Sequence, residues 1–478
     1  MARFGGRQAA NTGAFFIIAA IIGPEDLGAA SIAVAIAVLL RGLVTRGLRD
    51  YVIQSKTLTT EITSTAFWTN TLLGLVLAGG VVALSSLAGV LFGATSIISY
   101  VQVTAGVVLI GAISSIQEAL IERDFRHRIL TAAQLVASVL AATSAVILAI
   151  AGAGGWAVVA LSFIEALGMF FVVLVLGRWR PAMILNVAQA REQITFAMPI
   201  MLSATISGGY MRIAQLIVGA MVGVNAAAQF RVGSQVNQFL TQAVVSPINQ
   251  MLLPTFARSK AGADQKFVKA LSVYAAVVCP VFLGAAAIAP IAIYEVMGAE
   301  WRDAAVISSI LCLGIFSSLI GPVLYPLLIV EGSAGLAARL SIKGALFSLV
   351  TTSIGAMFGI YFAAVGFVAR GAFSIPASAF LARRVIGVPL RATVGAIAPF
   401  ALPALLMSAV VWGGVVALDA APAWVRLCAG VPVGVLIYAL SVRFIVPIAA
   451  PGAYGALVEG TPPILRRFLR ARPKGAQI

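Results

Sequence analysis

The chain has 478 residues, of which 61% are hydrophobic and only 10% are charged, and its formal net charge is +16. Charged residues make up about a quarter of an ordinary soluble domain, so this composition excludes that class. The mean hydropathy of +1.05 instead indicates a protein that lies largely within a membrane. The basic residues are spread over many short loops and form no basic face with interleaved aromatics, which excludes a nucleic-acid partner.

Long apolar segments recur along the whole chain and are separated by short polar loops. About 20 apolar residues suffice to cross the hydrocarbon layer as a helix. The pattern therefore predicts an all-α polytopic membrane protein with about 14 transmembrane helices. The expected spans are 8–22, 27–45, 64–91, 97–121, 129–151, 155–177, 194–219, 226–254, 268–297, 303–330, 335–359, 362–382, 392–417 and 423–447.

The positions of Lys and Arg predict the orientation of the chain. All but five of the 32 Lys and Arg residues lie in alternate loops or at the chain ends, and the other loops hold only Arg302 and Arg426. Cytoplasmic loops carry an excess of Lys and Arg. We therefore expect a multi-pass protein of the bacterial inner membrane with both termini in the cytoplasm.

Short sequence matches about 200 residues apart indicate an internal repeat. Gly223 follows Gly23 by 200 residues, and the segment 314–318 resembles 111–115 at an offset of 203 residues. Similarly, 258–260 resembles 54–56. The offset contains an even number of spans, so both copies have the same orientation. The sequence thus predicts two six-helix lobes, a parallel repeat, around a central cavity that holds the binding site.

The repeat divides the chain into four expected parts. These are an N-terminal six-helix lobe at 1–192, a C-terminal six-helix lobe at 193–386, two additional transmembrane helices at 387–450 and a basic cytoplasmic tail at 451–478.

Three basic residues, Arg212, Arg231 and Arg370, fall inside predicted spans. An arginine in hydrocarbon costs roughly 3 kcal/mol or more, so such residues usually face a wet cavity or a partner. The planar guanidinium forms paired hydrogen bonds with phosphate oxygens. The three arginines are therefore candidates for binding an anionic ligand, and a purely structural role is the alternative for each.

The eighth span carries polar residues at every third or fourth position, which places them on one helical face. They are Arg231, Gln235, Gln238, Gln242, Ser246 and Asn249. Such a stripe, about five turns long with an arginine at one end, favours the wall of a water-filled cavity over polar contacts between helices. Ser203, Ser207 and Tyr210 of the seventh span are further cavity-lining candidates.

Few acidic residues fall within the spans. Glu165 lies in the middle of the sixth span, where it either pairs with an arginine or takes part in ion coupling. Glu118 and Glu295 lie near span ends, where we expect them to face water. The sequence has no G-x-x-x-x-G-K-[ST] loop and no cluster with metal-ligand spacing, so we expect no ATP-hydrolysing module, no metal site and no cofactor.

Several short segments resemble the Wzx-type polysaccharide flippases of the multidrug/oligosaccharidyl-lipid/polysaccharide (MOP) exporter superfamily. The segments are Ile-Gly-Pro-Glu-Asp-Leu-Gly at 22–28, Thr-Ala-Phe-Trp-Thr-Asn at 65–70, Gly-Trp-Ala at 155–157, Arg-Trp-Arg-Pro at 178–181 and Gly-Ala-Glu-Trp at 298–301. The resemblance runs from about residue 8 to residue 386 and is strongest in the first 180 residues. No single motif is decisive, but their order along the chain is fairly specific.

The resemblance implies an alternating-access transporter, not an enzyme, with no catalytic residues. Its expected cargo is an undecaprenyl-pyrophosphate-linked oligosaccharide, an O-antigen or exopolysaccharide unit that is flipped across the inner membrane. By position, Arg212 and Arg231 match the cationic residues that receive the pyrophosphate headgroup in this family. The expected partners are membrane lipids and the polysaccharide polymerase and assembly machinery, and the expected state is a monomer.

Two features depart from the family pattern. Family members commonly carry Asn or Asp in the stretch 210–215, where this chain has Arg212 and Gln215, which puts coupling to H⁺ or Na⁺ at that point in doubt. The expected first span, 8–22, is also short for a membrane crossing, and we expect the true start codon to lie upstream.

Three alternatives remain at this point. A MATE-like drug or metabolite exporter should have carboxylates in its cavity, and acids are scarce here. A membrane polysaccharide polymerase or ligase should carry a long periplasmic loop with catalytic Arg or His, and none is found in the sequence. A non-transporting assembly scaffold would leave the polar stripe of the eighth span without a purpose.

Overall fold

The computed structural model describes residues 2–177, 179–258, 262–418 and 421–460, and within these ranges the secondary structure is helical, without strands. The chain forms two compact units. Unit 1 comprises residues 1–232 and 348–367, and unit 2 comprises 233–347 and 368–478. The lobe boundaries predicted at residues 192 and 386 stay predictions. Most of the predicted basic tail lies outside the described residues.

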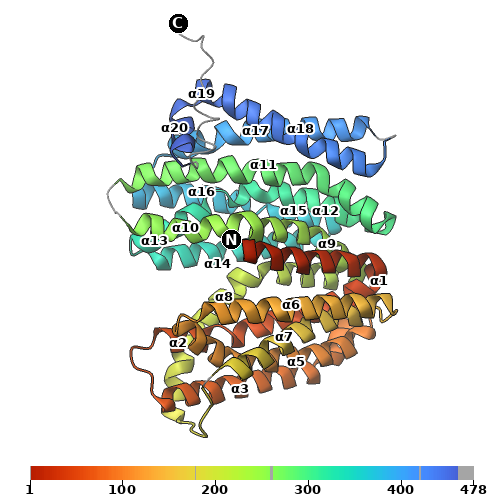
Figure 1. Cartoon of the computed structure of the whole chain (residues 1–478), viewed down its shortest axis with the longest axis vertical. Coiled ribbons are helices and arrows are strands. Elements are labelled where there is room, and N and C mark those ends of the chain that lie inside the picture. The colour runs from red at the N-terminus through yellow and green to blue at the C-terminus, as the bar shows by residue number, and fades with distance from the viewer. Residues whose placement is uncertain (1, 178, 259–261, 419–420, 461–478) are drawn as a thin grey trace. The chain divides into compact units, whose positions relative to one another are not determined.

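Unit 1 is an all-helical bundle in which α6 and α7 lie side by side (Figure 1). Its helices are α1 (Ala2–Val44), α2 (Gly47–Gln54), α3 (Thr60–Ala83), α4 (Ser85–Phe92), α5 (Ser96–Arg123), α6 (His127–Ile150), α7 (Trp156–Leu176), α8 (Val187–Met221) and the first part of α9 (Val224–Leu240). The end of α14 (Ala334–Ala356) and most of α15 (Ile360–Val368) also belong to it.

Unit 2 contains the remaining helices and two π-helical and two 3₁₀ stretches. They are η1 (Thr241–Val245), α10 (Ser246–Ala257), α11 (Ala263–Met297), η2 (Ala299–Trp301), α12 (Arg302–Leu313), η3 (Gly314–Ser318), α13 (Gly321–Val330), α16 (Gly371–Leu381), η4 (Ala382–Ile386), α17 (Leu390–Ala417), α18 (Ala423–Phe444), α19 (Val446–Ala449) and α20 (Pro451–Gly460). The two additional helices, α17 and α18, lie side by side and pack against α11 (Figure 1).

The number of membrane crossings agrees with the prediction of about 14. Twelve described segments are long and apolar enough to cross a membrane. One of them, α1, consists of two helices joined at Gly23, where φ is 74° and the backbone is non-helical. The segment 224–257 is a further helical stretch of suitable length, and its amide side chains make it too polar to be counted among the twelve.

The first span is longer than predicted from the sequence. We expected it at 8–22, but α1 is helical from Ala2. Gly23 then permits the turn, because its positive φ is readily adopted by glycine, and Pro24 begins the second half of α1. Gly223, its predicted counterpart, also has a positive φ, 120°, and precedes α9.

Helix bounds recur along the chain at the spacing predicted for the repeat. The third helix of unit 1, α3, begins at Thr60, and α11 begins at Ala263. Likewise α6 begins at His127 and α14 at Ala334. This recurrence supports two copies of one six-helix pattern.

Glycines bring α1 and α2 close to α8 along its length. A Cβ atom added at Gly47 would lie 2.7 Å from the backbone oxygen of Ala197, and one added at Gly209 would lie 2.5 Å from a Leu39 methyl carbon. Close approach of helices through small residues is a common source of stability in membranes. This contact holds α8, which carries several predicted site residues, against α1.

Polar contacts fix other helices of unit 1. The Asn70 side-chain amide of α3 donates to the Ala112 carbonyl, at 2.8 Å, and to Ser115 Oγ, at 2.7 Å, on α5. Asn186 caps α8 by accepting from the backbone amides of Ala188 and Gln189. Helix α3 is therefore bonded to α5 at mid-length, and α8 is capped at its N-terminal end.

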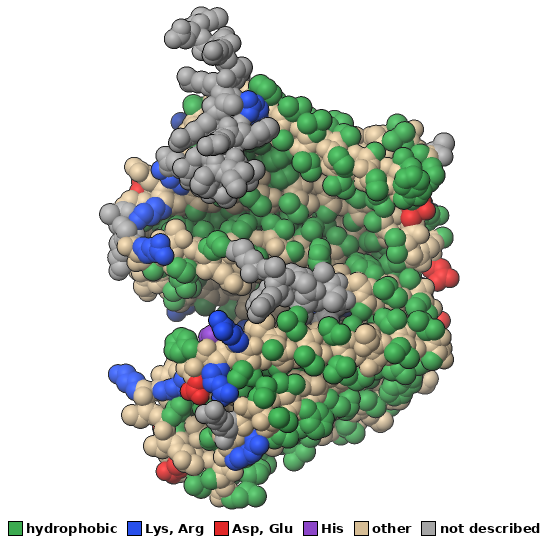
Figure 2. Space-filling view, in the orientation of Figure 1, with side chains coloured by type: hydrophobic (Ala, Val, Ile, Leu, Met, Phe, Trp, Pro, Cys, Tyr) green, Lys and Arg blue, Asp and Glu red, His purple; other side chains and the backbone are tan. Residues whose placement is uncertain are grey.

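The surface in Figure 2 is predominantly hydrophobic between the helix ends. In each unit, Lys and Arg side chains gather toward one end of the helices on this face. An apolar surface of this kind suits contact with lipid tails, and charged helix ends suit the polar layers that bound them.

The hairpin of α14 and α15 allows a direct test of close packing. A Cβ atom at Gly366 would lie 2.2 Å from the Thr351 carbonyl oxygen, so we expect Gly366→Ala to destabilise the protein by about 1–3 kcal/mol. The measurement is thermal unfolding of purified protein in detergent. Gly335→Ala, also on α14 but with open space around the added atom, is the matched control and should leave the melting temperature unchanged. Equal melting temperatures for both variants would contradict the packing described.

Candidate functional site

Most of the predicted site residues lie on α8 and on the helix after it. On α8, Ser203, Ser207 and Tyr210 are all partly exposed. The Ser203 hydroxyl donates to the Ile200 carbonyl, and the Ser207 hydroxyl donates to the Ser203 carbonyl. Both hydroxyl protons are thus used within α8, and only the oxygen lone pairs remain for a ligand.

Arg212 is held by a relay of side chains that reaches α1. Its guanidinium donates to Oε1 of Gln215 at 3.4 Å, and the Gln215 amide donates to Ser31 Oγ at 2.9 Å. Within the part of the chain that the structure describes, no carboxylate forms an ion pair with Arg212. Gln215, singled out from the sequence only as a departure from a family pattern, therefore positions Arg212.

Arg231 lies over an aromatic ring. Its guanidinium carbon is 4.6 Å from the centre of the Phe15 ring, which comes from the first half of α1. A cation–π contact of this kind contributes about 0.5–2 kcal/mol, depending on how far it is removed from water. The contact holds the guanidinium group over the Phe15 ring, but the ring carries no charge that could neutralise the arginine.

Arg212 on α8 and Arg231 on α9 lie within range of each other's charge. Like charges in a poorly solvating environment raise the free energy of both groups, and a bound anion lowers it. Of the three predicted headgroup ligands, Arg212 and Arg231 lie in the same unit. Their assignment to an anionic headgroup stays a prediction.

An aromatic cluster in unit 1 adjoins this pair in sequence. The Phe367 ring stacks on the Tyr210 ring at a centroid distance of 5.3 Å and meets the Phe230 ring edge-on at 6.1 Å. Tyr210 and Phe230 precede the two arginines by two residues and one residue. No sequence pattern pointed to Phe15 or Phe367, because aromatic residues are equally common on lipid-facing surfaces.

The predicted polar stripe does not run along one helical face. The π-helical stretch η1 lies within it, and its wider i→i+5 turns rotate the later residues by about a quarter turn relative to an uninterrupted α-helix. Gln235 and Gln238 precede η1, whereas Ser246 and Asn249 come after it. The expectation of a single face over five turns is therefore wrong.

The stripe residues also differ in exposure. Gln235 is buried and Gln238, which donates to Ser234 Oγ, is partly buried, whereas Gln242 is exposed. Asn249 has a buried Oδ1 that accepts no hydrogen bond from the described residues. Their assignment as cavity-lining residues stays a prediction.

Arg370 lies in unit 2 at a break between two helices. It precedes α16, and its guanidinium donates to Ser317 Oγ at 3.3 Å and contacts Ser318 Oγ. Both serines belong to η3, the 3₁₀ stretch between α12 and α13. Arg370 thus fastens one helix break to another, which favours the structural alternative, and its role as a headgroup ligand stays a prediction.

Of the three carboxylates singled out from the sequence, Glu118 is placed differently from what its position suggested, whereas Glu295 is exposed as expected. Glu165 on α7 accepts a hydrogen bond from Ser138 of α6 at 3.1 Å, and among the described residues it forms no ion pair with an arginine. Glu295 pairs with Arg426 at 2.8 Å. Glu118 does not face water as expected, because its side chain is only 13% exposed and contacts Arg49. Over the described ranges, no group of three His, Cys, Asp or Glu residues could hold a metal ion.

Two sequence comparisons relate the chain to known proteins. The family model described as "Polysaccharide biosynthesis protein" matches residues 17–306. The succinoglycan biosynthesis transport protein ExoT of Rhizobium meliloti (strain 1021) is 21% identical over 291 residues, which cover 60% of this chain and 59% of ExoT. The chain thus matches about three-fifths of the length of this curated relative.

Solved structures of similar fold are transporters and flippases. The lipid II flippase MurJ, in its inward closed conformation, matches with a TM-score of 0.74 at 12% identity, covering 93% of this chain and 97% of MurJ. An inward-facing multidrug resistance MATE family transporter of the MOP superfamily matches with a TM-score of 0.64 at 14% identity, covering 80% of this chain and 95% of that one. At these identities the likeness establishes the fold.

The contacts of Arg370 lead to a stability prediction. Because a lysine amine cannot reproduce the fork that reaches both serines, we expect Arg370→Lys to lower the free energy of unfolding by about 1–3 kcal/mol. Thermal unfolding in detergent measures this, with Arg339→Lys as the control. In a double-mutant cycle, replacing Ser317 and Ser318 by Ala should remove most of the difference. An unchanged melting temperature in Arg370→Lys would refute the structural role.

Proposed function

This chain belongs to the family of polysaccharide biosynthesis proteins, and on that premise we propose that it flips a lipid-linked saccharide across the membrane. Its fold is that of the MOP superfamily, which agrees with the resemblance predicted from the sequence. The proteins that it is similar to are transporters and flippases rather than enzymes. The proposed cargo is an oligosaccharide linked through pyrophosphate to undecaprenol.

The observation that carries the proposal is the arginine pair of unit 1. Arg212 and Arg231 lie in membrane helices within range of each other's charge, and no described carboxylate pairs with Arg212. A pyrophosphate group presents several oxygens to both guanidinium forks and neutralises their repulsion. The cost of holding two arginines within the membrane is thereby recovered when the headgroup binds.

Each neighbouring group has a role in this proposal. The Gln215–Ser31 relay holds Arg212, and the Phe15 ring holds Arg231, so the two forks are oriented before the ligand arrives. Orientation before binding reduces the entropy that binding costs. The oxygen lone pairs of Ser203 and Ser207 accept hydrogen bonds from sugar hydroxyls further along α8.

A drug or metabolite exporter is the nearest alternative, since a MATE transporter shares the fold. Cationic cargo would be repelled by Arg212 and Arg231 and would need a carboxylate partner. The half-buried Glu165, which faces Ser138 on α6, is the carboxylate near mid-membrane that could supply one, and it lies on α7 rather than on α8 or α9. The arginine pair therefore favours anionic cargo.

The setting of this activity follows from the same premise. We propose that the protein lies in the bacterial inner membrane with its basic loops and both termini in the cytoplasm, as the distribution of Lys and Arg predicts. Alternating access coupled to H⁺ or Na⁺, a monomeric state, and delivery to a polysaccharide polymerase and assembly machinery complete the proposal.

Complementation of a flippase-null, polysaccharide-producing strain tests this function. We expect the wild-type chain to restore surface polymer, and Arg212→Ala and Arg231→Ala each to lower it about 10- to 100-fold, because each removes charged hydrogen bonds worth about 1.5–3 kcal/mol. Arg302→Ala, at an exposed position, is the control and should restore polymer fully. Membrane levels of every variant are measured by immunoblot.

The possible outcomes test the flippase function and the arginine site separately. No polymer with the wild-type chain, despite normal membrane levels, would refute the flippase function in that pathway. Full polymer with the wild-type chain and with both alanine variants would preserve the function but refute the arginine pair as its headgroup site. Arg212→Lys keeps the charge without the fork, so intermediate polymer levels are expected for it.

A further inference from the structure

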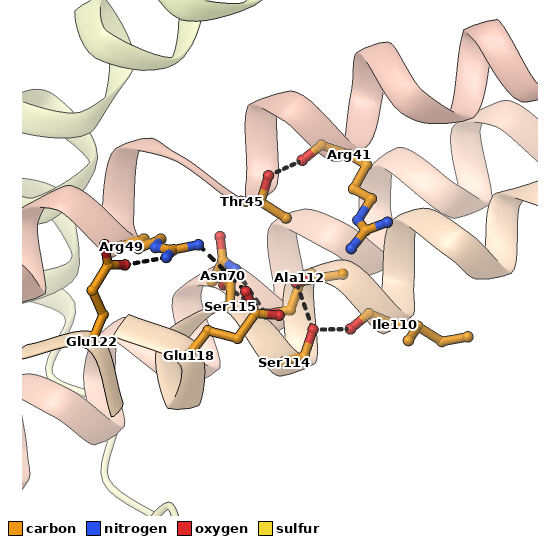
Figure 3. A network of polar contacts seen from close by, with 11 residues as sticks. Arg41, Thr45, Arg49, Asn70, Ile110, Ala112, Ser114, Ser115, Glu118 and Glu122 are labelled. Atoms are coloured by element: carbon orange, nitrogen blue, oxygen red, sulfur yellow. Dashed lines mark hydrogen bonds and ion pairs between the residues drawn. The ribbon is translucent and has the colours of Figure 1, made fainter. Parts of the chain in front are cut away.

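A cluster of charged side chains joins α2 to the end of α5 in unit 1 (Figure 3). Arg49 lies between Glu118 and Glu122, with its Nη1 3.3 Å from Oε2 of Glu118 and its Nη2 in contact with Oε2 of Glu122. We refer to these three residues as the charged triad. Their side chains are 25%, 13% and 35% exposed, so Glu118 is the most buried of the three.

The attachment of α2 does not depend on the triad. Arg123, the last residue of α5, donates to the carbonyls of Val52 and Ser55, both at 2.7 Å. Leu48 and Val52 are also fully buried in an apolar cluster with residues of α3, α5 and α8. Because α2 is fixed at its C-terminal end by these contacts, the triad is free to serve another purpose.

The internal repeat shows that the fold does not require charges here. With Ser317-Ser318 as the counterpart of Ser114-Ser115, Glu118 corresponds to Gly321 and Glu122 to Tyr325. At an offset of either 203 or 204 residues, Arg49 corresponds to a leucine, Leu252 or Leu253. Leu252 belongs to the apolar core of unit 2, and Tyr325 packs against that core.

Stability alone explains the triad poorly. Replacing a buried ion pair by apolar residues is often neutral or stabilising, so a triad kept in place of apolar packing needs another explanation. In the second copy of the helical pattern, the corresponding positions hold leucine, glycine and tyrosine. None of these residues can change its charge as a carboxylate does when it binds a proton.

Glu118 is the group suited to such a change. Three charges act on it: those of Arg49 on α2, Arg41 on α1 and Glu122 on its own helix. On helix α3, the nearby polar group is the neutral Asn70, which donates a hydrogen bond to Ser115. Asp50 on α2 interacts electrostatically with Glu122. Arg49 contacts Glu118 through Nη1 and Glu122 through Nη2, so its pair with Glu122 does not depend on the charge of Glu118.

Arg41 carries the second positive charge that acts on Glu118. Its side chain passes beside Gly111, where an added Cβ would lie 2.9 Å from Cγ of Arg41, and its guanidinium forms no ion pair among the described residues. An anion that binds Arg41 cancels one of the two positive charges that act on Glu118. A proton on Glu118 then compensates for that lost charge.

A proton fits this place better than a metal cation does. The Arg49 guanidinium occupies the position next to Oε2 of Glu118, and a sodium ion there would face a positive charge at short range. A proton requires no additional volume and leaves the pair of Arg49 and Glu122 intact. Glu122, one helical turn away and more exposed, provides a path for exchange with water.

We propose that Glu118 is a proton-binding site, which takes up a proton on its carboxylate while Arg49 stays paired with Glu122. The proposal of proton binding is argued from the contacts of the charged triad and does not require the flippase function. A role in transport does rest on the flippase function proposed above: in that role, headgroup binding and protonation of Glu118 favour each other. Glu118, rather than the mid-membrane Glu165, is then the coupling carboxylate.

Infrared spectroscopy of the purified protein in lipid nanodiscs tests proton binding without a substrate. As the pH is lowered, the carbonyl band of a protonated carboxylic acid grows for each titrating carboxylate. We expect one component of this band to be lost in Glu118→Gln and to persist in Glu165→Gln, the matched control, and in Glu122→Gln. An identical band in wild type and Glu118→Gln would overturn the proposal.

Two further measurements address folding and the identity of the ion. The triple variant Arg49→Leu/Glu118→Gly/Glu122→Tyr reproduces the second repeat; we expect it to elute as a single species and to lack the same band component. The wild-type titration is then repeated in sodium and in potassium buffers of equal ionic strength. Equal midpoints support a proton site, whereas a sodium-dependent shift that Glu118→Gln abolishes would overturn it in favour of sodium.

Complementation examines the coupling role separately. We expect Glu118→Gln to reduce surface polymer at least 10-fold while Glu165→Gln matches the wild-type chain, both at normal membrane levels. Full polymer with Glu118→Gln would refute the coupling role and leave proton binding to the infrared result. If the wild-type chain itself restores no polymer, the flippase function fails, and the infrared titration still decides whether Glu118 binds a proton.

Discussion

Hydrocarbon supplies neither hydrogen bonds nor solvation for charge, and this constraint accounts for most of the polar contacts in the molecule. In unit 1, the Asn70 amide bonds to Ser115 and to a backbone carbonyl, and serine hydroxyls donate to the preceding turn of their own helices. The hydrogen bonds of these groups are formed within the protein, so placing the groups in the membrane costs little free energy. Arg212 and Arg231 are different, because the helices around them orient their guanidinium groups and do not neutralise the charge of Arg212. The charge of Arg212, which no described carboxylate balances, is therefore a property of the folded protein.

The two copies of the helical pattern are alike in backbone and unlike in chemistry. Helices α3 and α11, and likewise α6 and α14, begin at corresponding places, and glycines with positive φ turn the chain at Gly23 and Gly223. The charged triad in one copy corresponds to leucine, glycine and tyrosine in the other. Conversely, the second copy has a 3₁₀ break fastened by Arg370, where the first copy has the continuous helix α5. A duplicated scaffold thus carries two different sets of polar residues, and each set is informative because the other copy shows that the scaffold folds without it.

How far the sequence predicted this structure depends on the range of each interaction. The spans could be predicted because hydropathy is a local property, and the turns at Gly23 and Gly223 could be predicted because positive φ favours one residue type. Arg212 and Arg231 stood out because a charge within an apolar run is conspicuous. The burial of Glu118 could not be predicted, since its partner Arg49 lies 69 residues away. Phe15 and Phe367 carried no signal, because an apolar ring in a membrane span is equally suited to lipid, core or site. The rotation of the polar stripe was missed because no residue pattern marks a π-helical stretch.

That π-helical stretch has a mechanical consequence. A π-turn holds one extra residue within a helix, and its wider turn rotates the residues after it relative to those before it. With η1 placed between Gln238 and Asn249, the amides on either side point in different directions while the helix stays continuous. Within hydrocarbon, where the backbone must stay hydrogen-bonded, η1 thus lets one helix present polar groups in two directions without a break.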